Sequence, residues 1–389
     1  MHTVQVSSSE AALKGSYVRS MLERRLTDQI RYTLSRKGFT NFTIERSQAR
    51  IIIDGVDPQE ASKALSRVFG AASIIPCLRT TTDFEDITQK ALQIARDTIQ
   101  DDESFAVRAK AIGEHPYSSN ELAVRIGSDV LRSMSQNGVH VNLDRPDRVI
   151  YVEARDHSGF VYTEVIHGPG GYPYGSQGRL VSLFSGGIDS PVATWMMMKR
   201  GADVVPVFFD QRPYVGEEYR ERALEAAKIL SDYVPLSSFS LYVADLSSVM
   251  EKILSSRKPG LRCILCKRSM YRLASQIAHK LGARGLITGE SMGQVASQTL
   301  DNLAVLSEAS KLPVYRPLIA FDKVEIEAVS KRIGTYAVTA RRVEGCSVVP
   351  KRPKTRSNLE DIKKLEDELD LAVLEPRIAD QLERVKFSA

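Results

Sequence analysis

The beginning of the chain alternates short apolar stretches with longer amphipathic ones. Apolar residues at every second position indicate strands, and apolar residues three or four positions apart indicate helices. The first eighty residues predict the order strand, helix, strand, strand, helix, strand, at residues 3–7, 17–36, 42–45, 50–53, 58–69 and 72–78. This order is typical of a ferredoxin-like unit. We therefore expect a small α+β domain over residues 1–80.

A second mixed block follows the first. Its pattern predicts a helix, a strand, a second helix and a two-stranded hairpin, at residues 83–99, 105–111, 118–134, 149–154 and 160–166. Ser118 or Ser119 is suited to cap the second helix, with Glu121 or Leu122 three positions beyond. The next stretch is too rich in glycine and proline to hold a regular element. We expect a second domain over residues 81–167 and a linker over 168–178.

The strands predicted after the linker are continuous apolar runs rather than alternating ones. They lie at residues 180–184, 204–209 and 285–288 and are separated by helical segments. Strands that are buried on both faces and joined by crossover helices form a parallel sheet. Residues 179–389 therefore predict an α/β domain with a doubly wound parallel sheet. In such domains ligands bind beyond the carboxyl ends of the strands.

The first of these strands runs into a glycine turn that is flanked by hydroxyl groups. Gly186 and Gly187 lack a Cβ, so their backbone N–H groups can approach oxyanions, and Ser185 and Ser190 add hydroxyl donors. Pro191 opens the helix that follows, and its amino-terminal end favours negative charge. The lysine that ends a kinase or GTPase loop is absent. The motif instead resembles the pyrophosphate loop of enzymes that split ATP between its α and β phosphates, although an ordinary tight turn is the simpler alternative.

Two other strand ends are predicted to flank this loop. Phe208 and Phe209 close one strand, and Gly289 follows the strand that ends at Thr288. A glycine at a strand end lets a nucleotide approach the backbone closely. The polar groups after it that could bind a ribose or a base edge are Glu290, Gln294, Ser297 and Gln298. The alternative is a plain glycine loop before a polar helix start.

Three of the four cysteines form a second candidate site. Cys263 and Cys266 make a C-x-x-C motif before or within a helix, and Cys346 lies in a later loop. The neighbouring Lys267 and Arg268 are expected to lower the thiol pKa values and favour thiolates. A single C-x-x-C is compatible with zinc, iron–sulfur or redox use. Three thiolates with one open position fit an iron–sulfur cluster, but a pair plus a reactive cysteine and three unrelated buried thiols are also open.

Charge and hydropathy limit the choice of partners. The 389 residues carry a net charge of +5, which permits a nucleic-acid partner without requiring one. The basic residues around Cys346 are Arg341, Arg342, Lys351, Arg352, Lys354 and Arg356. They form either a solvated face or a surface for a polyanion backbone. The chain shows neither an apolar run of membrane-spanning length nor a signal-peptide pattern, so we expect a cytoplasmic protein with no membrane partner.

Three segments together resemble the tRNA 4-thiouridine synthetase family, also called tRNA sulfurtransferases. They are SGGIDSPVA at residues 185–193, GESMGQVASQTL at residues 289–300 and the loop around Cys346. The resemblance covers essentially the whole chain. It implies an RNA-binding THUMP domain over residues 81–167 and a pyrophosphate-loop (PP-loop) ATPase domain over residues 179–389. It also implies that ATP adenylates a uridine at position eight in the tRNA elbow and that sulfur then replaces its O4.

The resemblance also assigns roles to individual residues. The implied contacts to ATP are Leu183, Phe184, Ser185, Gly186, Gly187, Asp189, Ser190, Phe208, Phe209, Lys267 or Arg268, Gly289 and Gln298. Asp189 is expected to hold magnesium (Mg2+) or position a phosphate. Cys346 matches the family's catalytic cysteine, and Cys263 and Cys266 look like the variant that builds a [4Fe-4S] or [3Fe-4S] cluster with it.

The chain departs from the best-known bacterial pattern at its carboxyl end. After a short helix we expect no rhodanese-like extension with a persulfide cysteine, which leaves sulfide and a cysteine desulfurase persulfide as candidate sulfur donors. The resemblance implies tRNA as the substrate, and we expect a homodimer. A role in making the thiazole of thiamine is also implied. The alternatives are an ATP-dependent amidating synthetase, and a non-catalytic RNA-binding protein whose C-x-x-C holds structural zinc.

Overall fold

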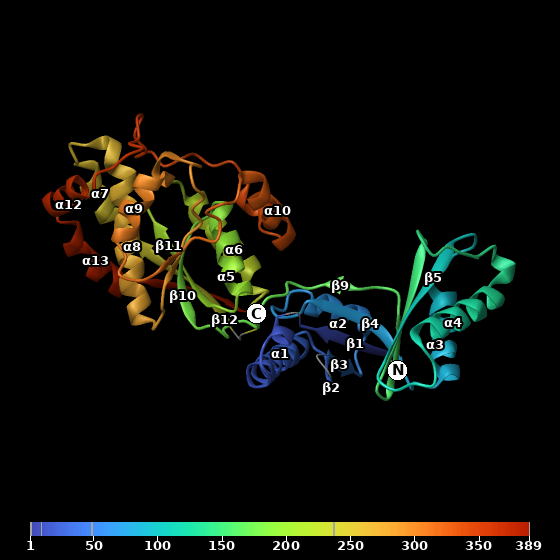
Figure 1. Ribbon diagram of the computed structural model, residues 1–389. Coiled ribbons are helices and arrows are strands. Elements are labelled where there is room, and N and C mark those ends of the chain that lie inside the picture. Colours follow the sequence, from blue (N-terminus) through green and yellow to red (C-terminus); the bar gives the residue numbers. More distant parts are fainter. Residues whose placement is uncertain (1, 9, 48–49, 236–237, 389) are drawn as a thin grey trace. The chain divides into compact units, whose positions relative to one another are not determined.

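The computed structural model describes residues 2–8, 10–47, 50–235 and 238–388, and it divides into two compact units (Figure 1). The first unit comprises Met1–Gly171 and the second Tyr172–Ala389. Among the described residues, no helix combines the length and the apolar character that a membrane span requires.

The amino-terminal half of the first unit has the predicted ferredoxin-like order. Its elements are β1 (His2–Ser7), η1 (Ala11–Leu13), α1 (Ser16–Arg36), β2 (Thr43–Ser47), β3 (Arg50–Asp54), α2 (Pro58–Leu65) and β4 (Ser73–Thr80). Strand β1 lies between β3 and β4 and is antiparallel to both. The helices bury Leu26, Ile30 and Leu65 against Val4 and Ile53 of the sheet, so the amphipathic pattern of the sequence produces this core.

The second half of this unit continues the same sheet. Its elements are α3 (Phe84–Thr98), β5 (Ser104–Ile112), α4 (Ser119–Ser133), η2 (Ser135–Asn137), β6 (His140–Val141), β7 (Arg148–Arg155), β8 (Ser158–Tyr162) and β9 (Ile166–His167). Ser118 caps α4, as predicted, and forms a capping box with Glu121. Strand β8 pairs antiparallel with β4, which gives the order β2-β3-β1-β4-β8-β7-β5-β6, with β9 also on β4. The two halves therefore share one hydrogen-bonded sheet, a continuity that the sequence did not predict.

The second unit is built on a six-stranded sheet in the order β14-β13-β10-β11-β12-β15. Its strands are β10 (Arg179–Phe184), β11 (Asp203–Asp210), β12 (Ser238–Asp245), β13 (Leu286–Ile287), β14 (Val314–Tyr315) and β15 (Glu383–Ser388). The first five in this order are parallel, which confirms the doubly wound prediction. Strand β15 is antiparallel to β12, so the chain ends on an edge strand and not on the expected helix.

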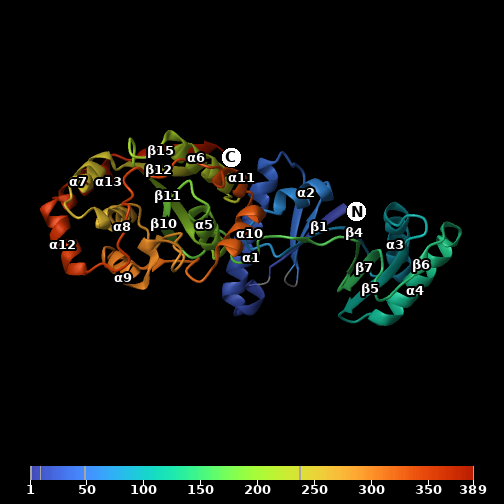
Figure 2. The same cartoon turned by 90° about the horizontal axis from the view of Figure 1, so that it is seen from above.

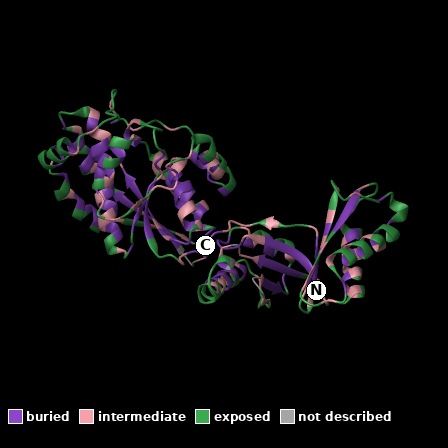
Figure 3. Ribbon diagram, viewed as in Figure 1, coloured by how far each residue is buried: buried purple, intermediate pink, exposed green. Residues whose placement is uncertain are grey.

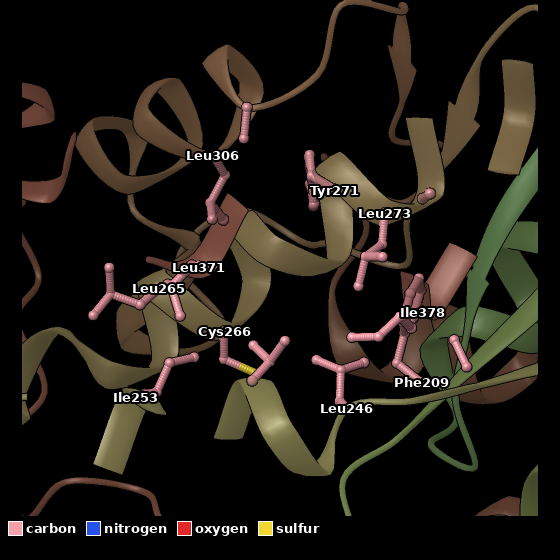
Figure 4. Close-up of a cluster of buried hydrophobic side chains, with 14 of the residues drawn as sticks. Phe209, Leu246, Ile253, Leu265, Cys266, Tyr271, Leu273, Leu306, Leu371 and Ile378 are labelled. Carbon is pink, nitrogen blue, oxygen red and sulfur yellow. The ribbon is translucent and has the colours of Figure 1, made fainter. Parts of the chain in front are cut away.

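Helices cover both faces of this sheet (Figure 1; Figure 2), and its strands are buried between them (Figure 3). They are α5 (Asp189–Lys199), α6 (Glu217–Ser231), α7 (Ser247–Leu254), η3 (Pro259–Leu261), α8 (Arg262–Lys280), η4 (Ala296–Gln298), α9 (Leu300–Glu308), α10 (Lys323–Ile333), α11 (Tyr336–Thr339), α12 (Leu359–Glu368) and α13 (Leu371–Asp380). The core around α8 includes Phe209, Leu265, Cys266 and Ile378 (Figure 4). The strand order reverses at β10, between β11 and β13, which is where such sheets bind ligands.

Candidate active site

The glycine loop joins β10 to α5 at the carboxyl edge of the sheet. The buried Ser190 hydroxyl accepts a hydrogen bond from the Ser185 N–H at 2.8 Å and lies 2.9 Å from the Ser185 hydroxyl. These bonds close the loop on itself. Helix α5 begins at Asp189, so Pro191 lies within its first turn rather than opening it. The helix therefore directs its amino-terminal N–H groups at the loop, as an anion site requires.

Gly186 is required by close packing rather than by its backbone angle. A Cβ at this position would lie 2.7 Å from the Tyr219 carbonyl oxygen and 2.9 Å from Arg222 Cβ, both on α6. Neither Gly186 nor Gly187 has a positive φ. Helix α6 thus presses directly on the back of the loop, and only a glycine fits between them.

Gly289 brings the end of β13 against the same loop. Its Cβ would lie 2.8 Å from the Ser190 backbone nitrogen. The structure therefore brings together the two glycine segments that are far apart in the sequence. The buried side chain of Gln298 lies beyond Gly289, and its Oε1 has no hydrogen-bond partner. A buried amide oxygen normally has one, and the amino group of an adenine is such a donor, so this environment fits a nucleotide.

The Asp189 carboxylate is held by two partners at the mouth of the loop. Its Oδ1 lies 3.0 Å from Lys323 Nζ, and its Oδ2 accepts from Gln294 Nε2 at 3.2 Å. Lys323 is the first residue of α10, and sequence reasoning missed it. A signal was present, because Asp322 and Glu325 form a capping box that marks this helix start. The pair places a lysine cation beside a phosphate cradle that lacks a lysine of its own.

Glu290 is a buried anion that three neighbours keep ionised. Its Oε2 accepts hydrogen bonds from Tyr271 (2.6 Å), Arg316 (2.9 Å) and Thr288 (3.0 Å). Its Oε1 lies 3.6 Å from Lys267 Nζ. Burial alone would raise the pKa of Glu290, but Lys267, Tyr271 and Arg316 outweigh it and lower the pKa below its usual value. This network fixes Lys267 at the end of β13, next to the glycine segments.

Arg268 faces the opposite way and belongs to the core. It is only 2% exposed. Its guanidinium donates to both carboxylate oxygens of Glu366 at 2.8 and 3.0 Å, to Glu308 at 3.0 Å and to the Val305 carbonyl. These bonds occupy the side chain away from the glycine loop. Of the two expected ATP contacts, the structure therefore favours Lys267 over Arg268.

The aromatic residues at the strand ends are buried. Phe184, Phe208 and Phe209 are core side chains, and Leu183 is partly buried against the core around α8. Phe184 and Phe208 are neighbours across the β10–β11 ladder. A nucleotide would therefore meet these residues through their backbone atoms rather than through their rings.

The three candidate cysteines are neighbours, and burial disfavours the thiolate form of Cys263 and Cys266. Cys263 and Cys266 lie in the first turn of α8, and Cys346 packs partly buried against the core that contains Cys266. The Cys266 sulfur accepts from Gln211 Nε2 at 3.0 Å. Burial and the charge of Cys346 raise the pKa of Cys263, and burial raises that of Cys266 to about 12. The expected lowering is therefore wrong, because burial outweighs the lowering effect of the Lys267 charge on the pKa of both thiols.

The same three thiols do not form a ready ligand set for a metal. In the part of the chain that the structure describes, no group of three or more Cys, His, Asp or Glu side chains has the spacing to hold a metal ion. All four cysteines are free thiols. The conformation therefore does not fit an iron–sulfur cluster as it stands. A cluster on these cysteines stays a prediction, and the chemistry proposed for this chain does not depend on one.

The basic residues near Cys346 divide into two groups. Arg341 pairs with Glu225, and Arg356 lies 3.3 Å from Asp301. Lys351 and Arg352 are exposed. The backbone around them is tied to η3, because the Lys354 N–H donates to the Gly260 carbonyl at 3.0 Å. The loop with these exposed cations therefore lies close in space to the helix start that carries Cys263.

The first unit has a basic pocket of its own. It lies at the start of α1 and has a volume of about 420 Å³. Its lining residues are Lys14, Ser16, Arg19, Ser20, Glu23, Arg46 and Ser47. Arg19 donates to Glu23 at 2.8 Å, so one of its cations is partly neutralised within the pocket.

The chain matches known families over most of its length. The ThiI ferredoxin-like domain matches residues 3–74, the THUMP domain matches residues 81–164, and the family described as thiamine biosynthesis protein (ThiI) matches residues 175–371. Similar proteins named probable tRNA sulfurtransferase come from Methanosarcina acetivorans and Methanothermobacter thermautotrophicus. The first is 38% identical and covers 99% of this chain and 93% of its own. The second is 37% identical and covers 93% and 92%.

Two solved structures share the architecture. A 4-thiouridine synthetase in complex with RNA and bound ATP is 30% identical over the full length of both chains, with a TM-score of 0.86. PH1313 from Pyrococcus horikoshii is 26% identical, covers 86% of this chain and all of its own, and has a TM-score of 0.66. The ferredoxin-like, THUMP and PP-loop folds predicted from the sequence are thereby confirmed. The chain belongs to the ThiI family of tRNA sulfurtransferases.

Proposed function

We propose that this chain uses ATP to adenylate the O4 of a tRNA uridine, at position eight in the elbow, and then replaces that oxygen with sulfur to give 4-thiouridine. One observation carries the proposal: the glycine loop and the segment around Cys346 both contact residues 214–222, at the start of α6 and just before it. Gly186 packs against Tyr219 and Arg222, and the Ser347 N–H donates to the Tyr214 carbonyl at 3.0 Å. The names of the relatives support the same reaction.

The first step is activation of an inert carbonyl oxygen. Uridine O4 attacks the α-phosphorus of ATP, the bond to the β-phosphate oxygen breaks, and pyrophosphate leaves. The loop N–H groups and the Lys323 ammonium stabilise the negative charge on the departing group. Asp189 is the carboxylate that would hold Mg2+, which prefers oxygen ligands and would help to neutralise the pyrophosphate. Lys267 and Gln298 bind the nucleotide in this proposal.

The second step replaces AMP with sulfur. Cys346 carries the sulfur as a persulfide, whose terminal sulfur bonds to C4 while the C4–O bond breaks and AMP leaves. Cys263 then attacks the Cys346 sulfur, which releases thiouridine and leaves a Cys263–Cys346 disulfide for an external thiol to reduce. Cys263 suits this role better than Cys266, because Cys263 is partly exposed and Cys266 is buried. A cysteine desulfurase persulfide passes its outer sulfur to the Cys346 thiol by thiol exchange. Sulfide is already fully reduced, so as a donor it attacks the Cys263–Cys346 disulfide, which leaves the persulfide on Cys346 and frees the Cys263 thiol.

The first unit holds the tRNA in this proposal, with residues 1–80 and 81–167 as its two RNA-binding parts and residues 168–178 as the linker. Binding depends on the phosphate backbone, for which the basic pocket at the start of α1 is suited. A homodimer would let the first unit of one subunit present tRNA to the second unit of the other. The reaction takes place in the cytoplasm, where we place the protein.

The proposal is tested with the full chain under anaerobic conditions. The chain is incubated with unmodified tRNA transcript, ATP, Mg2+ and a cysteine desulfurase with cysteine as the persulfide donor, and the products are measured by nucleoside mass spectrometry and by AMP release. We expect 4-thiouridine and AMP to form together, and neither to form on a transcript with cytidine at position eight. A complete absence of AMP with the uridine transcript would show that the proposed activation is wrong.

A further inference from the structure

Helix α6 carries a buried arginine, Arg222, whose guanidinium donates to a backbone carbonyl. Arg222 is 7% exposed, and its Nη1 donates to the backbone carbonyl of Arg341 at 2.6 Å. Its Nε is buried without a hydrogen-bond partner, and no carboxylate among the described residues pairs with its guanidinium. Burial lowers the pKa of Arg222, and the nearby charge of Arg341 adds to this effect. The guanidinium also lies over the Tyr219 ring, 5.3 Å from its centroid. A buried charge of this kind is costly to keep, so its hydrogen bond to a backbone carbonyl calls for an explanation.

The side chain of Arg341 also binds helix α6. Its Nη1 and Nη2 donate to the two carboxylate oxygens of Glu225 at 2.8 and 2.9 Å. Glu225 follows Arg222 by three positions on α6, so both side chains lie on one face of the helix. The backbone of Arg341 is thus held by Arg222, and its side chain is held by Glu225. We refer to these three residues as the α6 clamp.

The cysteine segment begins where the clamp ends. Residues 342–346 contain no helix or strand, and all of them are exposed or only partly buried. At the far end of this segment, the N–H and hydroxyl of Ser347 donate to the Tyr214 carbonyl at 3.0 and 3.1 Å. The position of Cys346 is therefore set by two anchors rather than by regular structure of its own.

The helix that holds this segment is also the helix that backs the glycine loop. Gly186 lies against Tyr219 and Arg222 so closely that a Cβ would not fit. One rigid element therefore contacts both the nucleotide loop and the entry to Cys346. We infer that Arg222 and Glu225 are positioning residues. They hold the Cys346 sulfur where it can reach C4 of the uridine that is activated at the glycine loop. This inference rests on the proposed role of Cys346 as the sulfur carrier.

The clamp can be opened without unfolding the chain. The side chains of Arg341 and Glu225 are 52% and 44% exposed, and surface pairs of this kind contribute little to stability. Glu225→Ala removes the outer contact, and Arg222→Met removes the inner one. Lys280→Ala is a matched control, because it breaks a similarly exposed ion pair between α8 and α13. In this pair the side chain of Lys280 is 44% exposed and that of Asp380 is 69% exposed.

The test separates activation from sulfur transfer. AMP release and 4-thiouridine are both measured with tRNA, ATP, Mg2+ and a cysteine desulfurase with cysteine as the persulfide donor. In Glu225→Ala and Arg222→Met we expect AMP release within about twofold of the unsubstituted chain and a loss of 4-thiouridine of roughly 10- to 100-fold, because a small misplacement of a reacting group costs about that much. The charge exchange Glu225→Arg with Arg341→Glu is expected to restore thiolation, and Lys280→Ala to leave both products unchanged.

A second readout does not need the reaction at all. The rate at which iodoacetamide alkylates Cys346 is followed by peptide mass spectrometry, and we expect a severalfold increase in Glu225→Ala and in Arg222→Met. An unchanged alkylation rate in both variants, or an equal loss of AMP and 4-thiouridine, would overturn the inference. If the unsubstituted chain forms no 4-thiouridine, the proposed function is wrong, and the alkylation rates alone decide whether the clamp positions Cys346.

Discussion

The charge that faces the nucleotide loop comes from two side chains that are distant in the sequence. Asp189 starts α5, and Lys323 starts α10, 3.0 Å away. We expect Asp189→Ala to abolish AMP formation in the presence of tRNA, and Lys323→Ala to lower it by about 10²- to 10³-fold, the usual cost of losing one group that stabilises developing charge. AMP is measured by chromatography of the reaction mixture.

Cys346→Ser is the control for this experiment, since it removes the sulfur carrier but leaves the glycine loop intact. It is expected to release AMP and form no 4-thiouridine. Undiminished AMP release by Asp189→Ala would contradict the role given to its carboxylate.

The four thiols are expected to differ in reactivity at pH 8. Burial raises the pKa of Cys77 and of Cys266 to about 12, so neither carries a thiolate at this pH, whereas Cys263 and Cys346 are partly exposed. Because only the thiolate reacts, alkylation of the two buried thiols should appear only as the pH rises toward 12 or when the chain unfolds. Peptide mass spectrometry before and after denaturation checks this, and equal labelling of all four in the native chain would contradict it.

Sequence motifs located the residues of the site, but not the directions in which they point. The spacing of Cys263, Cys266 and Lys267 suggested activated thiols, and burial reverses the sign of that effect. Arg268 follows Lys267 directly, yet a helix sends neighbouring residues to different faces, and the carboxylates that receive Arg268 come from α9 and α12. Lys323 reaches Asp189 only because α10 packs on α5. Partners that depend on tertiary packing are not encoded in a local pattern.

The packing between elements around the glycine loop leaves no room for a side chain. A Cβ at residue 289 would lie 2.8 Å from the Ser190 nitrogen, which is closer than atoms in contact normally approach. Gly289→Ala should therefore push the end of β13 away from α5, destabilise the fold by about 1–3 kcal/mol and weaken ATP binding. Thermal unfolding and calorimetric titration with ATP measure the two effects.

Gly127→Ala provides a matched control for Gly289→Ala. Gly127 lies inside α4, and its Cβ would meet only Val107 Cγ2 at 3.7 Å, an ordinary contact. Alanine is favoured over glycine in a helix, so this variant should be neutral or slightly stabilised, and its ATP binding should not change. Equal destabilisation of both variants would show that the contact at Gly289 is not the cause.

The order of the elements was predictable, because strand and helix periods are local properties of the sequence. Two features were not. Strand β15 follows α13 after a short turn, pairs with β12 and forms an ion pair with α6 through Glu383 and Arg220. The pairing of β4 with β8 joins residues that are about eighty positions apart, and nothing in either strand specifies it. Edge strands and long-range strand pairings depend on which other strand the folded chain places beside them, so a local sequence pattern does not predict them.

The whole molecule is expected to bind tRNA through its first unit. A fragment of residues 1–171 keeps the sheet of that unit and also the bonds from Gly168 and Gly170 to the carbonyls of Ala72 and Ala71. We expect it to fold and to bind tRNA, with affinity falling about tenfold or more between 50 and 200 mM salt as counterions compete for the phosphates. Fluorescence anisotropy with labelled tRNA measures both quantities.

The basic pocket at the start of α1 supplies the control for this measurement. Alanine at Lys14, Arg19 and Arg46 removes three of its cations, which should weaken binding and make it less dependent on salt. Binding that does not respond to salt, or no binding by the intact fragment, would count against the proposed role of the first unit.

The ladder between β4 and β8 has a consequence for how the chain can be divided. A cut between residues 80 and 81 falls between the two amino-terminal family matches. It would separate β4 from β8 and leave unpaired backbone amides and carbonyls on the edge of each piece. Bare strand edges recruit other chains and promote aggregation. Neither piece should stay soluble by itself, and residues 1–171 are the smallest amino-terminal portion that can be isolated intact.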